Sequence, residues 1–341
     1  MTIARVAIEP DDTPPGPATR LVLDDPPTTL DAALGFAPQL GAVAGTPGGG
    51  STRDLWEALA TLGSIDLGVV RAVEPHLDAL AILREAGVPA SGGASVTWGV
   101  FAAEGGDEPV RARELDGRWQ LSGTKPWCSL AARLDSALIT AHLPHGGRGL
   151  FTIELTDPGV TVRRDAWPSR GLSEIPSGPV VLAAVAAVPV GGTDWYLSRP
   201  GFAWGGIGVA ACWYGGAVAL ARSLYEGAGT VPAPILAMHL GRVDAHLQSA
   251  RRALAEAARL IDRAEVPDAA VMAKRVRAAV ATCCESVIAL VGHALGPAPL
   301  ALDAEHSKRV ADLQLYSRQH HAEKDEASLG STLAEMVVSP W

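Results

Sequence analysis

The segment LSGTKPWCS, residues 121–129, joins an alternating polar and apolar run to a turn with an aromatic side chain beside a hydroxyl. Asp116-Gly117 lies just upstream, between two alternating runs, and this spacing is typical of a β-hairpin. We therefore predict that the segment forms the second strand of a hairpin and the turn after it. Composition alone also allows an ordinary turn with a core tryptophan. The turn contains three candidate functional residues: Trp127, Cys128 and Ser129.

Short apolar or alternating runs continue on the C-terminal side of the hairpin, separated by Gly, Pro and Asp. Several short strands at such spacing are typical of a β-barrel or sandwich. We therefore predict a central β-barrel. Its further strands are expected at 137–143, 150–155, 160–163 and 180–190.

On both sides of this β region, apolar residues recur at helical spacing. The first third predicts a helix at about 28–37 and one long or two shorter helices over 53–86. The last third predicts a helix ending near Tyr225 and three more, at 234–263, 270–292 and 307–336. The sequence therefore predicts an α+β multidomain chain. Its parts are a short N-terminal helical region at 1–93, the β-barrel at 94–194 and a C-terminal helical bundle at 195–341.

Composition excludes several classes of protein. The 341 residues carry a formal net charge of −9, which disfavours nucleic-acid binding because phosphate contacts need a dense basic face. The uncharged stretch between Arg199 and Arg222 contains six glycines, so we expect a buried helix and no membrane span. The four cysteines lack CxxC spacing and the N-terminus lacks a signal-like segment, so we expect a cytoplasmic protein.

The motifs along the chain resemble those of the acyl-CoA dehydrogenase family. Segment 121–129 resembles that family's N-G-x-K-x-W-I-[ST] strand and turn. Further similar segments follow in the family's order, at 167–173, 177–180, 199–221, 270–274 and 292–296. The resemblance covers about residues 53–330, and the chain is identified as a divergent, shortened member. This relationship implies N-terminal helices, a central β-barrel and a C-terminal helical bundle.

The resemblance also implies a function. Trp127 would lie against the ring of a bound FAD, Ser129 near the N5 edge of that ring, and Cys128 between them in the same cofactor-binding turn. Such enzymes are oxidoreductases that remove hydrogen from the α and β carbons of an acyl thioester. The implied partner is a small acyl substrate, including a CoA thioester. The apolar helix faces imply a homodimer or homotetramer.

The chain departs from the family pattern at three places. Residues 100–107 replace the T-E-P-x-x-G-S-D segment, and residues 226–232 replace R-x-x-F-G. The family's glutamate base is also absent, and its place falls on or near His320, with no carboxylate at the alternative position Val209. His320 is therefore the candidate proton-handling residue. The alternative is that His320 and His321 coat a charged C-terminal helix.

These departures leave two further functions open. One is a flavin-dependent monooxygenase on the same fold, in which a histidine occupies this place. The other is a non-catalytic family member that lacks the base and part of the FAD site. We expect no metal site, because His239 and His246 are two helical turns apart. Glu74 and His76 are expected on a helix surface, with a pocket mouth as the alternative.

Overall fold

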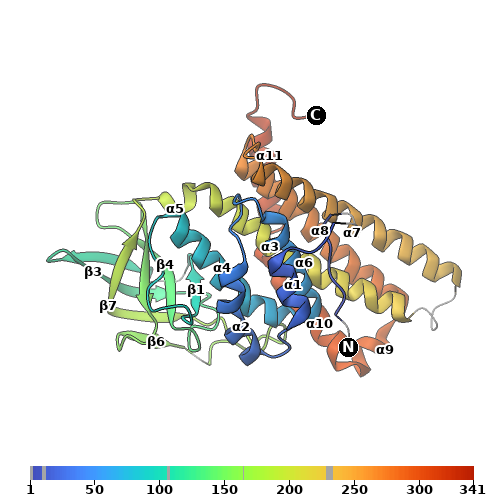
Figure 1. Cartoon of the computed structure of the whole chain (residues 1–341), viewed down its shortest axis with the longest axis horizontal. Coiled ribbons are helices and arrows are strands. Elements are labelled where there is room, and N and C mark those ends of the chain that lie inside the picture. The colour runs from blue at the N-terminus through green and yellow to red at the C-terminus, as the bar shows by residue number, and fades with distance from the viewer. Residues whose placement is uncertain (1–2, 10–12, 106–107, 164, 228–232) are drawn as a thin grey trace.

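Strands and helices are separated in space as they are in the sequence (Figure 1). The computed structural model describes residues 3–9, 13–105, 108–163, 165–227 and 233–341. In the view of Figure 1 the strands occupy the left-hand end, and the long helices of the last third occupy the right. The N-terminal helices lie between them and contact both, so the middle of the molecule is where a site could draw on all three parts of the chain.

Four helices precede the sheet. The predicted 53–86 helical region divides at Asp66, whose carboxylate accepts hydrogen bonds from the backbone N–H groups of Gly68 and Val69 and so caps a new helix. The first helix was not predicted. It begins at Pro17, and proline is tolerated in the first turn of a helix. The four are α1 (Pro17–Asp24), α2 (Leu30–Val43), α3 (Thr52–Ile65) and α4 (Leu67–Glu85).

The strands form one seven-stranded sheet with the order β1-β4-β2-β3-β7-β5, in which β6 pairs with β7 and β5 also pairs with β4. The predicted hairpin is present, with Leu115 opposite Arg118. β2 and β4 share a single residue pair, Arg111 with His142, so a closed barrel stays a prediction. The strands are β1 (Trp98–Phe101), β2 (Arg111–Leu115), β3 (Arg118–Lys125), β4 (Ser136–His142), β5 (Arg148–Glu154), β6 (Val160–Val162) and β7 (Val180–Val190).

The last third is helical, but its final predicted helix is wrong in length. The expected 307–336 helix ends at Tyr316 and resumes at Glu323. Between them His320 is extended and Ala322 has a φ of 44° in the left-handed region, so the helix cannot continue through this stretch. The elements are α5 (Trp195–Ser198), α6 (Pro200–Glu226), α7 (Ala233–Asp262), α8 (Ala269–Leu295), α9 (Pro297–Leu302), α10 (Ala304–Tyr316), the 3-10 helix η2 (Ser317–Gln319) and α11 (Glu323–Ala334).

Helix α6 runs through the middle of the helical part and packs against α3, α7 and α8. A Cβ atom on Gly215 would lie 2.0 Å from the backbone oxygen of Ala60 in α3, so glycine allows the two helices to approach closely. Both α6 and α8 are long and apolar enough to cross a membrane by composition. The most apolar 18-residue window of α6 is 72% buried, as expected of a core helix, whereas that of α8 is 33% buried.

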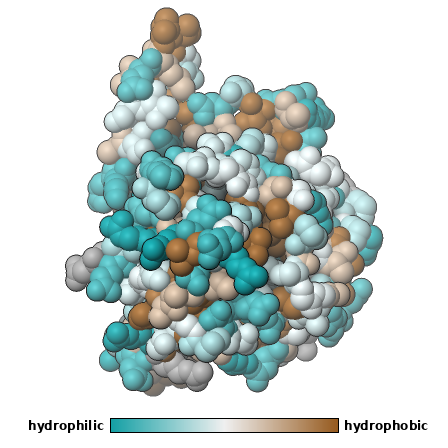
Figure 2. Space-filling view, turned by 90° about the vertical axis from the view of Figure 1, so that its left-hand side faces the viewer, coloured by the Kyte–Doolittle hydropathy of each residue, from teal (hydrophilic) through white to brown (hydrophobic). Residues whose placement is uncertain are grey.

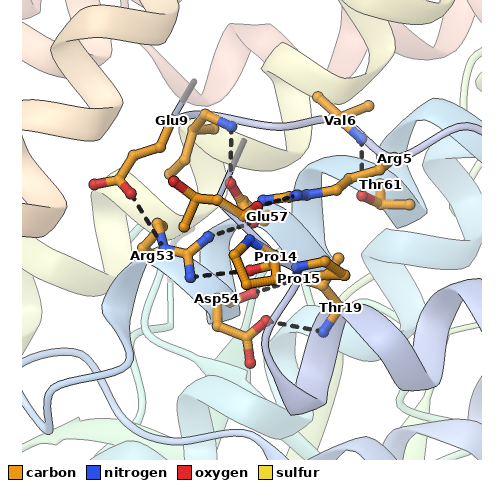
Figure 3. Close-up of polar contacts among 12 residues, drawn as sticks. Arg5, Val6, Glu9, Pro14, Pro15, Thr19, Arg53, Asp54, Glu57 and Thr61 are labelled. Atoms are coloured by element: carbon orange, nitrogen blue, oxygen red, sulfur yellow. Dashed lines mark hydrogen bonds and ion pairs between the residues drawn. The ribbon is translucent and has the colours of Figure 1, made fainter. Parts of the chain in front are cut away.

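The chain N-terminal to α1 is fastened to α3 by buried charges (Figure 3). Glu57 in α3 is fully buried and contacts Arg5 at 2.6 Å and Arg53 at 3.1 Å. Its other oxygen accepts a hydrogen bond from the backbone N–H of Ile8. One turn earlier, Asp54 accepts from the backbone N–H of Thr19, near the start of α1. We call Arg5, Arg53, Asp54 and Glu57 the N-terminal clamp.

Candidate functional site

The turn after β3 presents its tryptophan to the outside. Trp127 has a φ of 59°, a conformation uncommon for a bulky side chain, and is 59% exposed. Its indole meets that of Trp167 edge to face, with the ring centroids 6.1 Å apart. The Trp127 indole is therefore not packed into the sheet, and it can stack on a planar ligand.

Two residues after Trp127, the hydroxyl of Ser129 lies in a hydrogen-bond chain whose direction can be worked out. Ser177 Oγ donates to the backbone oxygen of Ile175 at 3.0 Å, so its proton is in use. Ser129 Oγ, 2.7 Å from Ser177 Oγ, must then be the donor of that bond. Arg71 Nη2 in α4 donates to Ser129 Oγ at 3.0 Å. Ser129 is thus positioned from both sides, by the helical and the β parts.

Cys128 points the opposite way from Trp127. It is buried, and its thiol donates to the backbone oxygen of Lys125 at 3.2 Å. Burial raises the pKa of this thiol to about 12, so it stays protonated at neutral pH. Within the predicted cofactor-binding turn, Cys128 holds the turn from inside.

Lys125, the last residue of β3, is buried and supports the same turn. Its Nζ donates to Thr140 Oγ1 at 2.8 Å and to Glu104 Oε1 at 3.1 Å. Burial alone raises the pKa of Glu104. The charge of Lys125 and its hydrogen bond lower this pKa by a larger amount, so the net pKa is below the usual value. Glu104 belongs to the segment in place of the family's T-E-P pattern, of which residues 106–107 lie outside the described residues.

His320 lies directly after η2 and is buried, with 6% of its surface exposed. Burial lowers its pKa, opposed by the nearby Asp325 charge, so the imidazole is mostly neutral at neutral pH. The idea that both histidines coat a charged helix therefore fits only His321, whose side chain is exposed beside Asp325. Among the described residues, no hydrogen bond joins His320 to the turn at 127–129.

An aromatic pair lies between the two predicted site regions. The rings of Trp213 and Tyr316 meet edge to face, with centroids 6.2 Å apart. The guanidinium of Arg71, which also holds Ser129, lies 5.8 Å from the centre of the Tyr316 ring. The guanidinium of Arg277 lies 4.8 Å from the centre of the Trp213 ring and contributes to the electrostatic environment of His320. The two arginines thus flank the aromatic pair on opposite sides.

A cavity of about 430 Å³ lies beside this region, between α3, α4, α6 and the end of α7. Its wall contains Glu74, Asp78 and Arg199. Glu74 is only 7% exposed, and its nearest cation is Arg71 at 3.4 Å. The expected helix-surface position of Glu74 is therefore wrong, because this face of α4 packs towards α6.

The electrostatics of the cavity follow from burial. Burial raises the pKa of Glu74 to about 7, against the lowering effect of Arg71. Burial also raises the pKa of Asp78, against the lowering effect of Arg199. His76 on the same helix is buried, and burial lowers its pKa to about 4, so it is neutral. Helical spacing groups Arg71, Glu74 and Asp78 on one face, a signal that could have identified them.

One group of three carboxylates resembles a metal site: Asp66, Glu174 and Asp312. Lys308 Nζ lies among them, at 2.8, 2.7 and 2.6 Å respectively. An ammonium group at this position satisfies the carboxylates that a cation would otherwise need to bind. We therefore assign the group a structural role, joining the N-terminus of α4, the 165–178 loop and α10.

The residues of the 127–129 turn fit the ring of a flavin. An exposed indole offers a stacking surface, and a hydroxyl held by Arg71 offers a polar contact at its edge. To donate a hydrogen bond to such a ring, Ser129 must first break the hydrogen bond that it donates to Ser177 Oγ. The chain's substitute for the family's R-x-x-F-G segment falls mainly on residues 228–232, outside the described residues.

No protein-family model matches the sequence, and no curated protein matches it. Solved structures are similar in fold. KijD3, in complex with FMN and a dTDP-linked amino-keto sugar, is 16% identical, with a TM-score of 0.78 over 95% of each chain. FMN-bound TdsC from Paenibacillus sp. A11-2 is 19% identical, with a TM-score of 0.73 over 92% of each chain.

A third similar structure, PigA with FAD and proline, is 16% identical, with a TM-score of 0.75 over 94% of this chain and 93% of that one. Identities this low establish the fold and leave the chemistry open. The chain has the acyl-CoA dehydrogenase-like fold, with N-terminal helices, a central sheet and C-terminal helices, that these flavin-bound proteins share.

Proposed function

We propose that the protein is a flavin-dependent monooxygenase. The observation that carries this proposal is the 127–129 turn, where an exposed Trp127 stands beside a hydroxyl anchored by Arg71. A flavin bound there supplies redox chemistry, including reaction with molecular oxygen. TdsC, one of the structures with this fold, is a dibenzothiophene monooxygenase.

The residues of this chain have distinct tasks in that reaction. Trp127 holds the ring by stacking, and Ser129 provides a hydrogen bond at its edge. Arg71 fixes Ser129 through its Nη2 and faces Glu74 through its Nη1. Burial lowers the pKa of His320, so its imidazole is neutral near pH 7 and has a nitrogen free to accept a proton.

The second candidate is α,β-dehydrogenation of an acyl thioester, and one observation favours it. Glu74 is a buried carboxyl with a pKa of about 7, and a carboxylate of that basicity suits removal of an acidic α-proton. The charges of the cavity argue the other way. Three carboxylates line it, Glu74, Asp78 and Glu85, against two arginines, Arg84 and Arg199, and this balance disfavours the phosphates of coenzyme A.

The form of the flavin and the assembly are also proposals. FAD is our expectation from the resemblance, whereas the similar structures hold FMN in KijD3 and TdsC and FAD in PigA. A homodimer or homotetramer is supported by the apolar window of α8, of which 33% is buried. The C-terminal tail adds exposed apolar side chains, Val337, Val338 and Trp341. A projection with a hydrophobic tip stands at the top of Figure 2. A cytoplasmic location stays a prediction.

The deciding experiment is an absorbance spectrum of the purified protein, followed by chromatography of the released cofactor. A yellow protein that consumes oxygen when supplied with reduced flavin supports the monooxygenase. Bleaching of the flavin by an acyl-CoA under anaerobic conditions supports the dehydrogenase instead. A colourless protein that neither FMN nor FAD can reconstitute contradicts both and supports a non-catalytic protein.

A further inference from the structure

We propose that the cavity between α3, α4 and α6 binds a compact organic amine with an apolar, ring-sized body. This inference deepens the proposed function by naming the class of its substrate, but the binding it describes needs no flavin. Four walls define the site: the aromatic side chains of Trp56 and Trp204, the carboxylates of Glu74 and Asp78, the guanidinium of Arg199, and the bare backbone of Gly208.

The volume suits a small ligand. At about 430 Å³, the cavity is at the lower end of the size range for small-molecule sites. Gly208 leaves room in its wall, since a Cβ there would meet only ordinary contacts, with Trp56 Nε1 at 3.4 Å and Leu59 Cδ1 at 3.7 Å. A single ring with a short side chain fits within such a space.

Polar groups in the wall have unused bonding capacity. Trp56 is fully buried, and its Nε1 has no hydrogen-bond partner in the described part of the chain. The Nε1 of Trp204 is unpaired in the same sense. Asp78 accepts no hydrogen bond from any described residue and meets Arg199 only at 4.0 Å. Asp78, with 21% of its side chain exposed in the cavity wall, is the group among these that a ligand can reach and complete, whereas the two indole N–H groups have almost no accessible surface.

Charge decides the class of that ligand. Arg199 is already engaged with Glu85 at 2.6 Å, which leaves Asp78 as the carboxylate it satisfies least. Glu74 has only the long contact to Arg71. An ammonium group placed between Asp78 and Glu74 would stabilise the ionised form of both carboxylates. The partly exposed indole of Trp204 in the same wall adds an apolar surface for the body of the ligand. An anionic ligand would meet the same carboxylates and be repelled.

Three compounds with one benzene ring and different charge test this directly. We would titrate 2-phenylethylamine, 2-phenylethanol and 3-phenylpropionate into the full-length protein at pH 8 by calorimetry. The amine is expected to bind about tenfold or more tightly than the alcohol, because charge-assisted hydrogen bonds exceed neutral ones. The propionate is expected to bind least. Equal affinities, no binding of the amine, or preference for the propionate would overturn the proposal.

Two pairs of variants locate the site. Asp78→Asn should reduce the preference for amine over alcohol about tenfold, whereas Glu114→Gln, an exposed charge change on β2, should leave it unaltered. Gly208→Ala should weaken binding of all three compounds by filling the wall. Gly206→Ala is the matched control, since its Cβ would contact Arg277 at an ordinary 3.6 Å outside the cavity. Thermal unfolding of each variant verifies that it is folded.

The two proposals can fail separately. A colourless protein that still prefers the amine, and loses the preference in Asp78→Asn, contradicts the proposed flavin function and retains the amine site. A yellow, oxygen-consuming protein without that preference retains the function and eliminates the amine site. A preference for the amine that persists in Asp78→Asn, together with unchanged affinities in Gly208→Ala, means binding elsewhere and rejects the assignment to this cavity.

Discussion

Two buried glutamates on neighbouring helices of this protein differ in how completely their carboxylates are paired. Glu57 in α3 is fully paired within the N-terminal clamp, by two arginines and a backbone N–H. Glu74 in α4 is nearly as buried but has only one distant arginine, and burial raises its pKa to about 7. A buried carboxylate whose ion pairs and hydrogen bonds are all formed therefore helps to hold the fold. One that lacks these partners remains available for proton transfer or ligand binding.

The largest expected effect is on the clamp. Glu57→Gln leaves Arg5 and Arg53 without their buried anion, and we expect a loss of about 3–5 kcal/mol in the free energy of unfolding. Denaturant unfolding followed by circular dichroism measures it. Glu9→Gln is the control, because Glu9 meets Arg53 at 3.5 Å near the surface, and its loss should cost less than about 1 kcal/mol. Equal losses in the two variants would mean that the clamp is not a stabilising unit.

The next largest effect is expected at the candidate functional site, where a substitution should lower activity more than it lowers stability. His320→Ala should slow turnover about 100-fold, because proton transfer loses its acceptor, while the unfolding midpoint changes little. The pH profile of the residual activity should no longer show the rise that accompanies formation of the neutral His320 imidazole. A large loss of stability with little loss of turnover would show that His320 has a packing role. The candidate site would then not differ from the N-terminal clamp at that residue.

The pH dependence of stability sharpens the contrast at Glu74. Its pKa is raised from 4.5 to about 7 in the folded protein, so the folded state binds more protons than the unfolded state between these values. Stability that is fully present below about pH 4.5 is therefore lost as the pH rises to about 7. Glu74→Gln removes this loss, and the variant should gain on the order of 3 kcal/mol over wild type between pH 4.5 and 8. Parallel stability curves for the two proteins would show that Glu74 is ionised throughout.

The smallest effect concerns Trp127. Trp127→Ala removes a stacking surface that is 59% exposed, so we expect about tenfold weaker flavin retention and almost unchanged stability. Trp341→Ala, at a side chain 96% exposed in the tail, is the matched control and should retain flavin normally. Unaltered flavin content in Trp127→Ala would remove the turn from the cofactor site.

Local sequence patterns predicted six of the seven strands and several helices, and missed β1 (Trp98–Phe101). The hairpin at Asp116-Gly117 and the β7 segment are where alternation placed them, because period-2 patterns and turn residues act locally. The sequence could not reveal the clamp, since Arg5 and Glu57 are far apart in the chain and meet only after folding. The buried face of α4 was missed for a related reason. Spacing groups residues on one side of a helix but does not say what packs against it.

The three-carboxylate contact of Lys308 affects how the site can move. Leu172 donates its backbone N–H to Asp312 at 2.6 Å, and Glu174 is bound to Lys308, so α10 fixes the 165–178 loop at two points. A Cβ on Gly171 would lie 2.3 Å from the backbone oxygen of Ala311, so the loop packs directly against the helix there. Trp167 and Ser177 lie at the two ends of this loop. The loop that packs against the 127–129 turn is therefore held partly by ionic contacts, and raised ionic strength should loosen its attachment to α10.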